Sequence, residues 1–312
     1  MPVLGLDTSN YTTSAAVFDG RAGQNVGRLL QVKPGQLGLR QSEALFQHVK
    51  QLPALLEELG GAGALAGLKA VGASTRPRAV EGSYMPCFLA GESQGRGIAA
   101  ALGVPFYPWS HQQGHLAAAA WSAGQPELLD RPFLAWHLSG GTTELLRVEP
   151  DGPAPRAEIL GGTSDISAGQ LIDRTGVLLG LPFPAGKALD ALYSGADTAV
   201  EFRVKLSGLT FSLSGMENQV KRLLEEGEKP ANVARFTLDT VISVVFRATQ
   251  EAQRRYPGLP VLCSGGVASN ARLREVLSQH CGALFAQPRY AADNAMGTAI
   301  LTWRALERGE RP

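Results

Sequence analysis

Short apolar runs separated by polar turns open the chain and return near its middle. Residues 3–18 contain two apolar runs with hydroxyl side chains between them, and Asp7 stands at the end of the first run. This pattern predicts two strands joined by a polar turn. Residues 133–146 show the same order of strand, small polar turn and strand. The recurrence predicts an internal duplication.

Helical periodicity dominates the stretch between the two strand pairs. Apolar residues recur at helical spacing over residues 41–59 and predict a helix that Pro53 interrupts, with His48 on its polar side. We interpret this stretch as core packing or a partner-helix surface. Further along, a predicted helix carries Asp165 and Asp173. The remaining predicted elements are strands over 68–74 and 104–107 and helices over 91–102, 163–181 and 271–278.

A histidine pair stands at the start of another predicted helix. Ser110, followed three residues later by Gln113, is a capping-box signature, and the Ala-rich residues behind it favour helix. His111 and His115 then lie on one face of the first two turns. Two imidazoles at this spacing can hold a divalent transition metal with a third ligand from elsewhere. The alternative is a polar surface feature.

An acidic residue near the C-terminus is a candidate for that third ligand. Asp293 directly precedes a predicted helix that runs through Trp303. An Asp at this position is commonly an N-cap, and that interpretation stays open. Asp293 is also the best-placed carboxylate for the metal.

Glycine clusters beside apolar runs indicate turns that approach phosphate. The strand that ends in Gly265 and Gly266 before a helix lets the backbone approach a nucleotide closely. The N-terminal strand pair can hold a phosphate through its turn, while Asp7 orients a metal or water. As a single motif it is weak, because most such strand pairs bind nothing. Arg76 and Arg78 either meet phosphate or lie in a solvated loop.

Composition limits the classes of partner and compartment. The 312 residues, 44% of them hydrophobic, suffice for one large domain or two ordinary ones. Lys+Arg number 29 against 28 Asp+Glu, so the formal net charge of +1 produces no general field for nucleic acid, although a local patch remains possible. Three widely spaced cysteines indicate a reducing compartment. Without a signal sequence or a membrane span, we expect a soluble cytoplasmic protein with no membrane partner.

Together these pieces resemble a known superfamily and one branch of it. Two strand–turn–strand units with a strand–Gly-Gly–helix element are the layout of the actin, Hsp70 and sugar-kinase (ASKHA) superfamily. Over nearly its whole length the chain resembles the TsaD/YgjD/Gcp glycoprotease-like family. The most specific matches are residues 111–115 (HQQGH), 139–142 (SGGT), 265–270 (GGVASN) and 293–295 (DNA).

The resemblance implies a fold and a division of the chain. It implies an α/β, actin-like and Hsp70-like fold, in which a duplicated ribonuclease-H-like unit forms two lobes around a nucleotide cleft. Residues 1–125 would be the half with the histidine motif, and residues 126–312 the half with the nucleotide-binding turns.

The family also implies an activity. Its members make threonylcarbamoyladenosine, moving the threonylcarbamoyl group from threonylcarbamoyl-adenylate to N6 of the adenosine beside the anticodon of tRNA. The chain would thus be a metal-dependent acyltransferase in tRNA modification. Its partners would be tRNA, a paralogous actin-like protein and an ATPase, and a homo-oligomer is a further possibility.

Site residues are carried over by motif position. His111, His115 and Asp293 would bind one divalent ion, iron or zinc, and we assign catalytic roles to Asp7 and Ser9. An adenine nucleotide, threonylcarbamoyl-AMP or ATP/ADP, would be held by Leu138, Ser139, Gly140, Gly141, Thr142, Asp173, Gly186, Gly265, Gly266 and Asn270. The metal would act as a Lewis acid while the glycine turns stabilise the leaving AMP, so no protein nucleophile is needed and the protease label gains no support.

Several positions depart from the family pattern, which fits a divergent paralogue. They are Tyr11 and Thr12 in place of an acidic pair, Arg76 in an expected Gly-Pro-Gly-Leu turn, Thr142 in place of His, Gln170 in place of Glu, and Glu217 in place of Lys. The alternatives are a related carbamoyltransferase and a nucleotide- and metal-binding complex partner without turnover. An ATP-dependent small-molecule kinase ranks lowest, because such kinases need no His-His-Asp site.

Overall fold

Two compact units make up the part of the chain that the computed structural model describes, residues 1–32, 39–199 and 203–311. The first unit joins three separate segments, Met1–Arg131, Glu149–Arg156 and Ala292–Pro312. The second unit contains Pro132–Val148 and Ala157–Ala291. The last helix of the chain therefore folds with the N-terminal residues.

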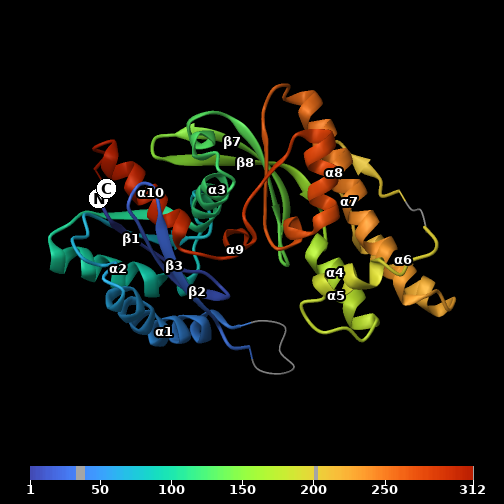
Figure 1. Cartoon of the computed structure of the whole chain (residues 1–312), viewed down its shortest axis with the longest axis horizontal. Coiled ribbons are helices and arrows are strands. Elements are labelled where there is room, and N and C mark those ends of the chain that lie inside the picture. The colour runs from blue at the N-terminus through green and yellow to red at the C-terminus, as the bar shows by residue number, and fades with distance from the viewer. Residues whose placement is uncertain (33–38, 200–202, 312) are drawn as a thin grey trace. The chain divides into compact units, whose positions relative to one another are not determined.

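A five-stranded sheet with the order β3-β2-β1-β4-β5 forms the middle of the first unit (Figure 1). β1 pairs antiparallel with β2, and β2 pairs antiparallel with β3, so the predicted strand–turn–strand unit is confirmed. β4 runs parallel to β1, and β5 runs parallel to β4. The bounds are Val3–Thr8 (β1), Thr12–Phe18 (β2), Gly23–Leu29 (β3), Val71–Arg76 (β4) and Phe106–Ser110 (β5).

Helices cover both faces of this sheet. α1 and α2 pack on one face, where Leu4 and Leu6 of β1 share an apolar core with Leu52 of α1. α10 packs on the other face and lies beside α3. It comes so close that a Cβ at Gly5 would lie 2.4 Å from the backbone nitrogen of Ala299. The bounds are Gln41–Gly61 (α1), Leu89–Leu102 (α2), His111–Ser122 (α3) and Met296–Glu307 (α10), with short 3-10 turns at Pro86–Phe88 (η1) and Pro126–Asp130 (η2).

Two expectations for α1 were wrong. The helix continues through Pro53, because burial of its apolar face outweighs the one hydrogen bond that a proline cannot donate. His48 is fully buried and lies 2.8 Å from the hydroxyl of Thr13, instead of on the polar side. An apolar periodicity shows which face is buried but does not show that a polar residue has a partner inside.

The second sheet has the order β12-β11-β6-β7-β8-β10-β9. β6 pairs antiparallel with β7, β11 runs parallel to β6, and β12 runs parallel to β11. The order β8-β7-β6-β11-β12 repeats that of the first sheet, which confirms the predicted duplication. The bounds are Phe133–Leu138 (β6), Thr143–Asp151 (β7), Ala154–Thr163 (β8), Leu206–Ser207 (β9), Thr210–Phe211 (β10), Val261–Ser264 (β11) and Leu284–Phe285 (β12).

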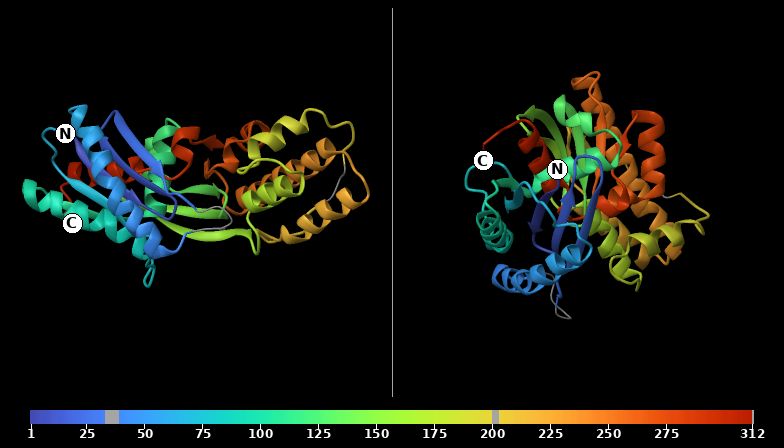
Figure 2. Two further views of the ribbon diagram at one scale, coloured as in Figure 1. Left: turned by 90° about the horizontal axis from the view of Figure 1, so that it is seen from below. Right: turned by 60° about the vertical axis from the view of Figure 1, so that its left-hand side comes forward.

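Helices of the second unit gather around the long α7, the orange helix in Figures 1 and 2. In the core, the indole nitrogen of Trp136 donates to the hydroxyl of Thr249 on α7. The bounds are Ala168–Leu178 (α4), Gly186–Tyr193 (α5), Ser214–Glu225 (α6), Pro230–Arg255 (α7), Ala271–Cys281 (α8) and Pro288–Ala291 (α9), with a 3-10 turn at Val267–Ser269 (η3). None of the helices described is long and apolar enough to cross a membrane.

The prediction that Asp165 lies on a helix was also wrong. Asp165 precedes α4, and its carboxylate accepts hydrogen bonds from the hydroxyls of Ser212 and Ser214 and from the backbone nitrogen of Leu213. An Asp that can bond to nearby backbone nitrogens favours a turn over a helix interior. Asp165 thereby fixes the start of α6.

Candidate functional site

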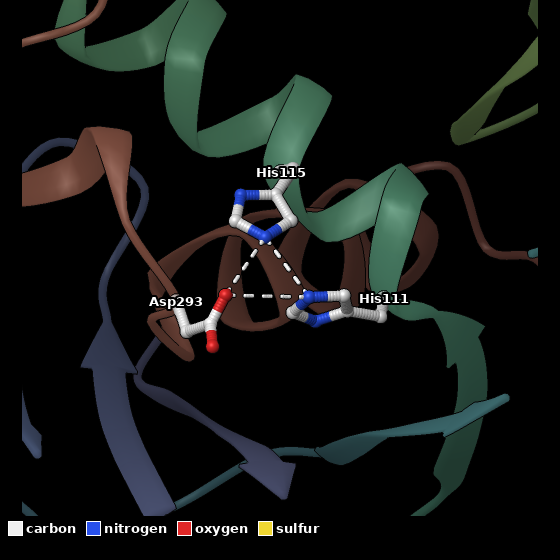
Figure 3. Close-up of side chains that lie close together, drawn as sticks. All are labelled: His111, His115 and Asp293. Atoms are coloured by element: carbon white, nitrogen blue, oxygen red, sulfur yellow. Dashed lines mark hydrogen bonds and ion pairs between the residues drawn. The ribbon is translucent and has the colours of Figure 1, made fainter. Parts of the chain in front are cut away.

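The start of α3 brings the two histidines onto one face, as predicted. The hydroxyl of Ser110 accepts from the backbone nitrogen of Gln113, and the Gln113 side chain accepts from the backbone nitrogen of Ser110. This capping box confirms the sequence signal. His111 and His115 point toward the same place, where Asp293 also lies (Figure 3).

Asp293 reaches this place because α10 packs against α3. At their contact two glycines face each other, and a Cβ at Gly297 would lie 1.7 Å from the carbonyl oxygen of Gly114. The N-cap position of α10 is held by Ala295, so the N-cap interpretation of Asp293 was wrong. The carboxylate of Asp293 is thus available to the histidines.

The three side chains have the spacing that one metal ion requires. The Nε2 atoms of His111 and His115 are 2.9 Å apart, and Oδ1 of Asp293 lies 3.5 Å from the first and 3.3 Å from the second. Ligand bonds of about 2.0–2.2 Å at angles of about 90–110° place neighbouring ligand atoms about 2.8–3.6 Å apart. This His-His-Asp set therefore fits a divalent transition metal, and iron and zinc suit it equally.

Asp7 supports the cluster from β1. Its side chain is almost fully buried, and its Oδ2 lies 2.8 Å from Nδ1 of His111. The hydroxyl of Ser74 donates to the same oxygen at 2.5 Å and lies 3.1 Å from the hydroxyl of Thr298. A carboxylate bonded to the outer nitrogen of a ligating histidine fixes its tautomer and ring orientation. Asp7 therefore has the geometry of a positioning residue.

Charges around the cluster attract a cation. Burial raises the pKa of Asp293, but hydrogen bonds with His111 and His115 outweigh it and hold that pKa well below its usual range. Burial lowers the pKa of His111, but the charge of Asp7 and hydrogen bonds with Asp293 and Asp7 raise it to about 10. The place between the two carboxylates thus favours positive charge, supplied by a proton or by a metal ion.

The turn after β1 holds the second residue with a predicted catalytic role. The backbone nitrogen of Ser9 donates to Asp7, while its hydroxyl is buried and has no hydrogen-bond partner within the described part of the chain. Tyr11 is about half exposed, and Thr12 begins β2. The acidic pair expected in this turn is therefore replaced by two neutral side chains.

Residues 138–142 form the corresponding turn in the second unit. The backbone nitrogen of Ser139 donates to the carbonyl of Thr142, and the hydroxyl of Ser139 accepts from the backbone nitrogen of Thr142. Gly265 lies against this turn with φ of 99°, and a Cβ there would lie 2.1 Å from the carbonyl oxygen of Leu138. Methyl groups at Gly140, Gly141, Gly186 and Gly266 would meet no described atom within 4 Å, so the Cβ side of their backbone is open to close approach.

The remaining predicted nucleotide residues hold neighbouring helices in place. Asp173 of α4 accepts from the backbone nitrogen of Ala185, just before Gly186 and α5. Asn270 accepts from the backbone nitrogen of Leu273 as N-cap of α8 and donates to Asp190 of α5. These contacts link α4, α5 and α8 behind the glycine turns.

Two departures from the family pattern have local structural explanations. Gln170 closes a capping box with Ser167 at the start of α4, a task that Gln and Glu perform alike. Glu217 forms ion pairs with Arg174 and Lys221, at 2.6 and 2.8 Å. Both side chains therefore have partners within the chain.

Sequence reasoning missed the residues that tie the cluster together. Ser74 and Thr298 bond to each other although 224 positions separate them, and Gly114 meets Gly297. Small residues at helical spacing in α3 and α10 were a signal for close helix contact, but they do not identify the partner.

Comparisons with known proteins agree over most of the chain. The TsaD family, described as tRNA N6-adenosine threonylcarbamoyltransferase, matches residues 35–300. A protein of that name from Thermus thermophilus is 35% identical, covering 100% of this chain and 95% of its own length. A protein of the same name from Ralstonia pickettii is 32% identical, covering 89% of this chain and 82% of its own length.

Solved structures show the same fold at low identity. The activator of 2-hydroxyisocaproyl-CoA dehydratase from Clostridium difficile is 14% identical with a TM-score of 0.54, covering 99% of this chain and 97% of its own. HypF of T. kodakarensis is 14% identical with a TM-score of 0.61, covering 98% of this chain and 48% of HypF. These likenesses confirm the predicted actin-like, Hsp70-like fold class.

Proposed function

The chain belongs to the TsaD family of tRNA N6-adenosine threonylcarbamoyltransferases, and on that premise we propose that it transfers a threonylcarbamoyl group to N6 of the adenosine beside the anticodon of tRNA. The observation that supports this most is the convergence of His111, His115 and Asp293, whose ligand atoms all lie within 4.8 Å of one another. The donor would be threonylcarbamoyl-adenylate, and AMP would leave as the new N–C bond forms.

The metal-binding role is part of the proposal. His111, His115 and Asp293 would hold one divalent ion, iron or zinc, which when bound would act as a Lewis acid toward the transferred carbamoyl group. Asp7 would keep His111 oriented, with Ser74 holding Asp7 in turn. The ligand atoms already have the mutual distances that one shared metal ion requires, so the site needs little rearrangement to bind the ion.

We assign the nucleotide to the second unit. The open backbone of Gly140, Gly141 and Gly266 would approach the adenylate phosphate, where free N–H groups stabilise the charge on leaving AMP. Asp173, Gly186 and Asn270 would complete the site. The halves predicted at residues 1–125 and 126–312, the cytoplasmic location, the tRNA, paralogous and ATPase partners and a homo-oligomer stay predictions.

Metal analysis tests the candidate centre directly. The purified protein should contain about one equivalent of iron or zinc, and a His111→Ala/His115→Ala variant should lose it while remaining folded by circular dichroism. His280→Ala changes an exposed histidine of α8 and serves as the matched control. Unchanged occupancy in the double variant would refute the site.

Activity requires a separate assay. With tRNA, threonine, bicarbonate, ATP, a companion synthase and partner proteins, we expect threonylcarbamoyladenosine to accumulate and the double histidine variant to be inactive. Modified adenosine at background level with the intact, metal-loaded protein would remove the transferase proposal.

A second candidate function rests on Tyr11 and Thr12. Because two neutral residues replace the expected acidic pair beside Ser9, the chain could bind metal and nucleotide as a complex partner without turnover, or run a related carbamoyl transfer. Calorimetry separates these from the first proposal: nucleotide binding without product favours the non-catalytic role. Steady turnover with tRNA excludes it.

A further inference from the structure

A hollow in the second unit is lined mainly by basic side chains. Its volume is about 510 Å³, and its lining residues come from α7 and from the residues that lead into β9. None of the described residues that line it is acidic. The lining consists of Arg203, Val204, Lys205, Leu206, Arg247, Gln250 and Arg254.

Arg247 stands in the wall of this hollow with half of its guanidinium group in use. Its Nη2 donates to the carbonyl oxygen of Val204 at 2.6 Å, which fixes the plane of the group. Its Nη1 is buried and has no hydrogen-bond partner within the described part of the chain. A buried donor without an acceptor is unfavourable, so an acceptor from outside the chain would be stabilised there.

The other cations leave the hollow with excess positive charge. Arg254 forms an ion pair with Glu251 at 2.8 Å. Arg203 and Lys205 are exposed, and neither has an ion pair with any residue that the structure describes. Burial and the charge of Arg203 lower the pKa of Arg247, as expected where positive charge is not neutralised.

We propose that this hollow binds a phosphate group. Guanidinium N–H groups donate charge-assisted hydrogen bonds to phosphate oxygens, and Nη1 of Arg247 has no acceptor among the described residues. The group could belong to an RNA backbone or to a free phosphate compound. Cations that continue from buried Arg247 to exposed Arg203 and Lys205 favour the backbone, which carries several phosphates in a row.

Binding to a fluorescent oligouridine, measured by anisotropy over a range of salt, tests the proposal. Removing two charges in Arg203→Gln/Lys205→Gln should weaken binding about tenfold and flatten the log–log salt dependence by about 1.4, since each single-strand phosphate contact contributes about 0.7. Lys69→Gln/Arg131→Gln removes one exposed lysine and one exposed arginine of the first unit and should leave both quantities unchanged. Equal losses in the two double variants would overturn the proposal.

A second variant separates geometry from charge. Arg247→Lys keeps the positive charge but loses the planar guanidinium group, and we expect this variant to bind oligouridine several-fold more weakly. If this variant does not fold, the Arg203→Gln/Lys205→Gln variant still tests the proposal. Full affinity in a folded Arg247→Lys protein would contradict the role of Arg247.

Inorganic phosphate distinguishes the two sources. A free-phosphate site would be shown if millimolar phosphate competed with oligouridine and this competition were lost in the Arg203→Gln/Lys205→Gln variant. An RNA backbone site would be shown if oligouridine bound and phosphate did not compete with it. Binding of neither probe would refute the inference. The RNA source rests on the proposed function, but no arm uses threonylcarbamoyl transfer, so failure here and failure of the transfer assay are distinguishable.

Discussion

Replacing Gly297 by alanine should separate the two helices that carry the candidate metal ligands. The added Cβ would lie 1.7 Å from the carbonyl oxygen of Gly114, about 1.7 Å short of the 3.4 Å at which ordinary contact begins. Backbone atoms cannot rotate away as a side chain can. Overpacking of this kind costs about 1–3 kcal/mol, which exceeds the roughly 0.5–1 kcal/mol that alanine gains over glycine within a helix.

The same shift should impair metal binding. His111 and His115 lie on α3, and Asp293 lies three residues before the start of α10. A change in helix separation therefore changes the distances from Asp293 to the two histidines, which now measure 3.5 and 3.3 Å. Sites of this type tolerate displacements of only about 0.5 Å. An ion present at 100 times its dissociation constant adds about 2.7 kcal/mol to the free energy of unfolding, and the variant should lose most of that gain.

Urea unfolding with and without saturating zinc measures both effects. Gly97→Ala is the matched control, because Gly97 lies inside α2 and a methyl group there would meet no atom within 4 Å. The control should keep the zinc-dependent gain and be slightly more stable than the original protein. If Gly297→Ala were destabilised but kept the full zinc gain, the glycine contact would not determine the ligand geometry.

Three further predictions concern buried and hydrogen-bonded groups. Burial raises the pKa of Asp165, but hydrogen bonds from Ser212 and Ser214 lower it below its usual range. Asp165→Asn should therefore lower the free energy of unfolding by about 1 kcal/mol at neutral pH and by progressively less below about pH 4. Urea unfolding at several pH values measures this difference. Burial lowers the pKa of His48, so the free energy of unfolding should fall as the pH drops below about 6.5. A His48→Gln variant whose free energy of unfolding depends on pH in the same way would contradict this. Burial raises the pKa of Cys87 to about 12 and raises those of the other two buried cysteines, so a thiol reagent at pH 8 should label the protein only after unfolding.

Local signals in the sequence were sufficient for some features. The capping box of Ser110 and Gln113 predicted the start of α3, because both partners lie within one helical turn. The repeated strand–turn–strand pattern predicted the duplicated topology, since alternation and turn composition act over neighbouring residues. Strand bounds were less accurate: the strand predicted over 68–74 is Val71–Arg76.

Other features depended on contacts between residues far apart in sequence. His48 is buried against Thr13, and Asp165 binds residues of α6, so neither environment could be inferred from neighbours along the chain. Asp293 was chosen as a ligand by resemblance and by its place before a helix. Only the packing of α10 on α3 placed its carboxylate 3.3 Å from His115.

The sequence by itself therefore determined the helix starts, the turns, the repeated unit and the residue types suited to a metal. Tertiary structure decided which of these residues meet, because the distances between ligands depend on close contacts such as that of Gly297 with Gly114, which no local pattern specifies. It also decided that Asp7, a buried carboxylate on the first strand, supports His111 on a helix 104 positions later.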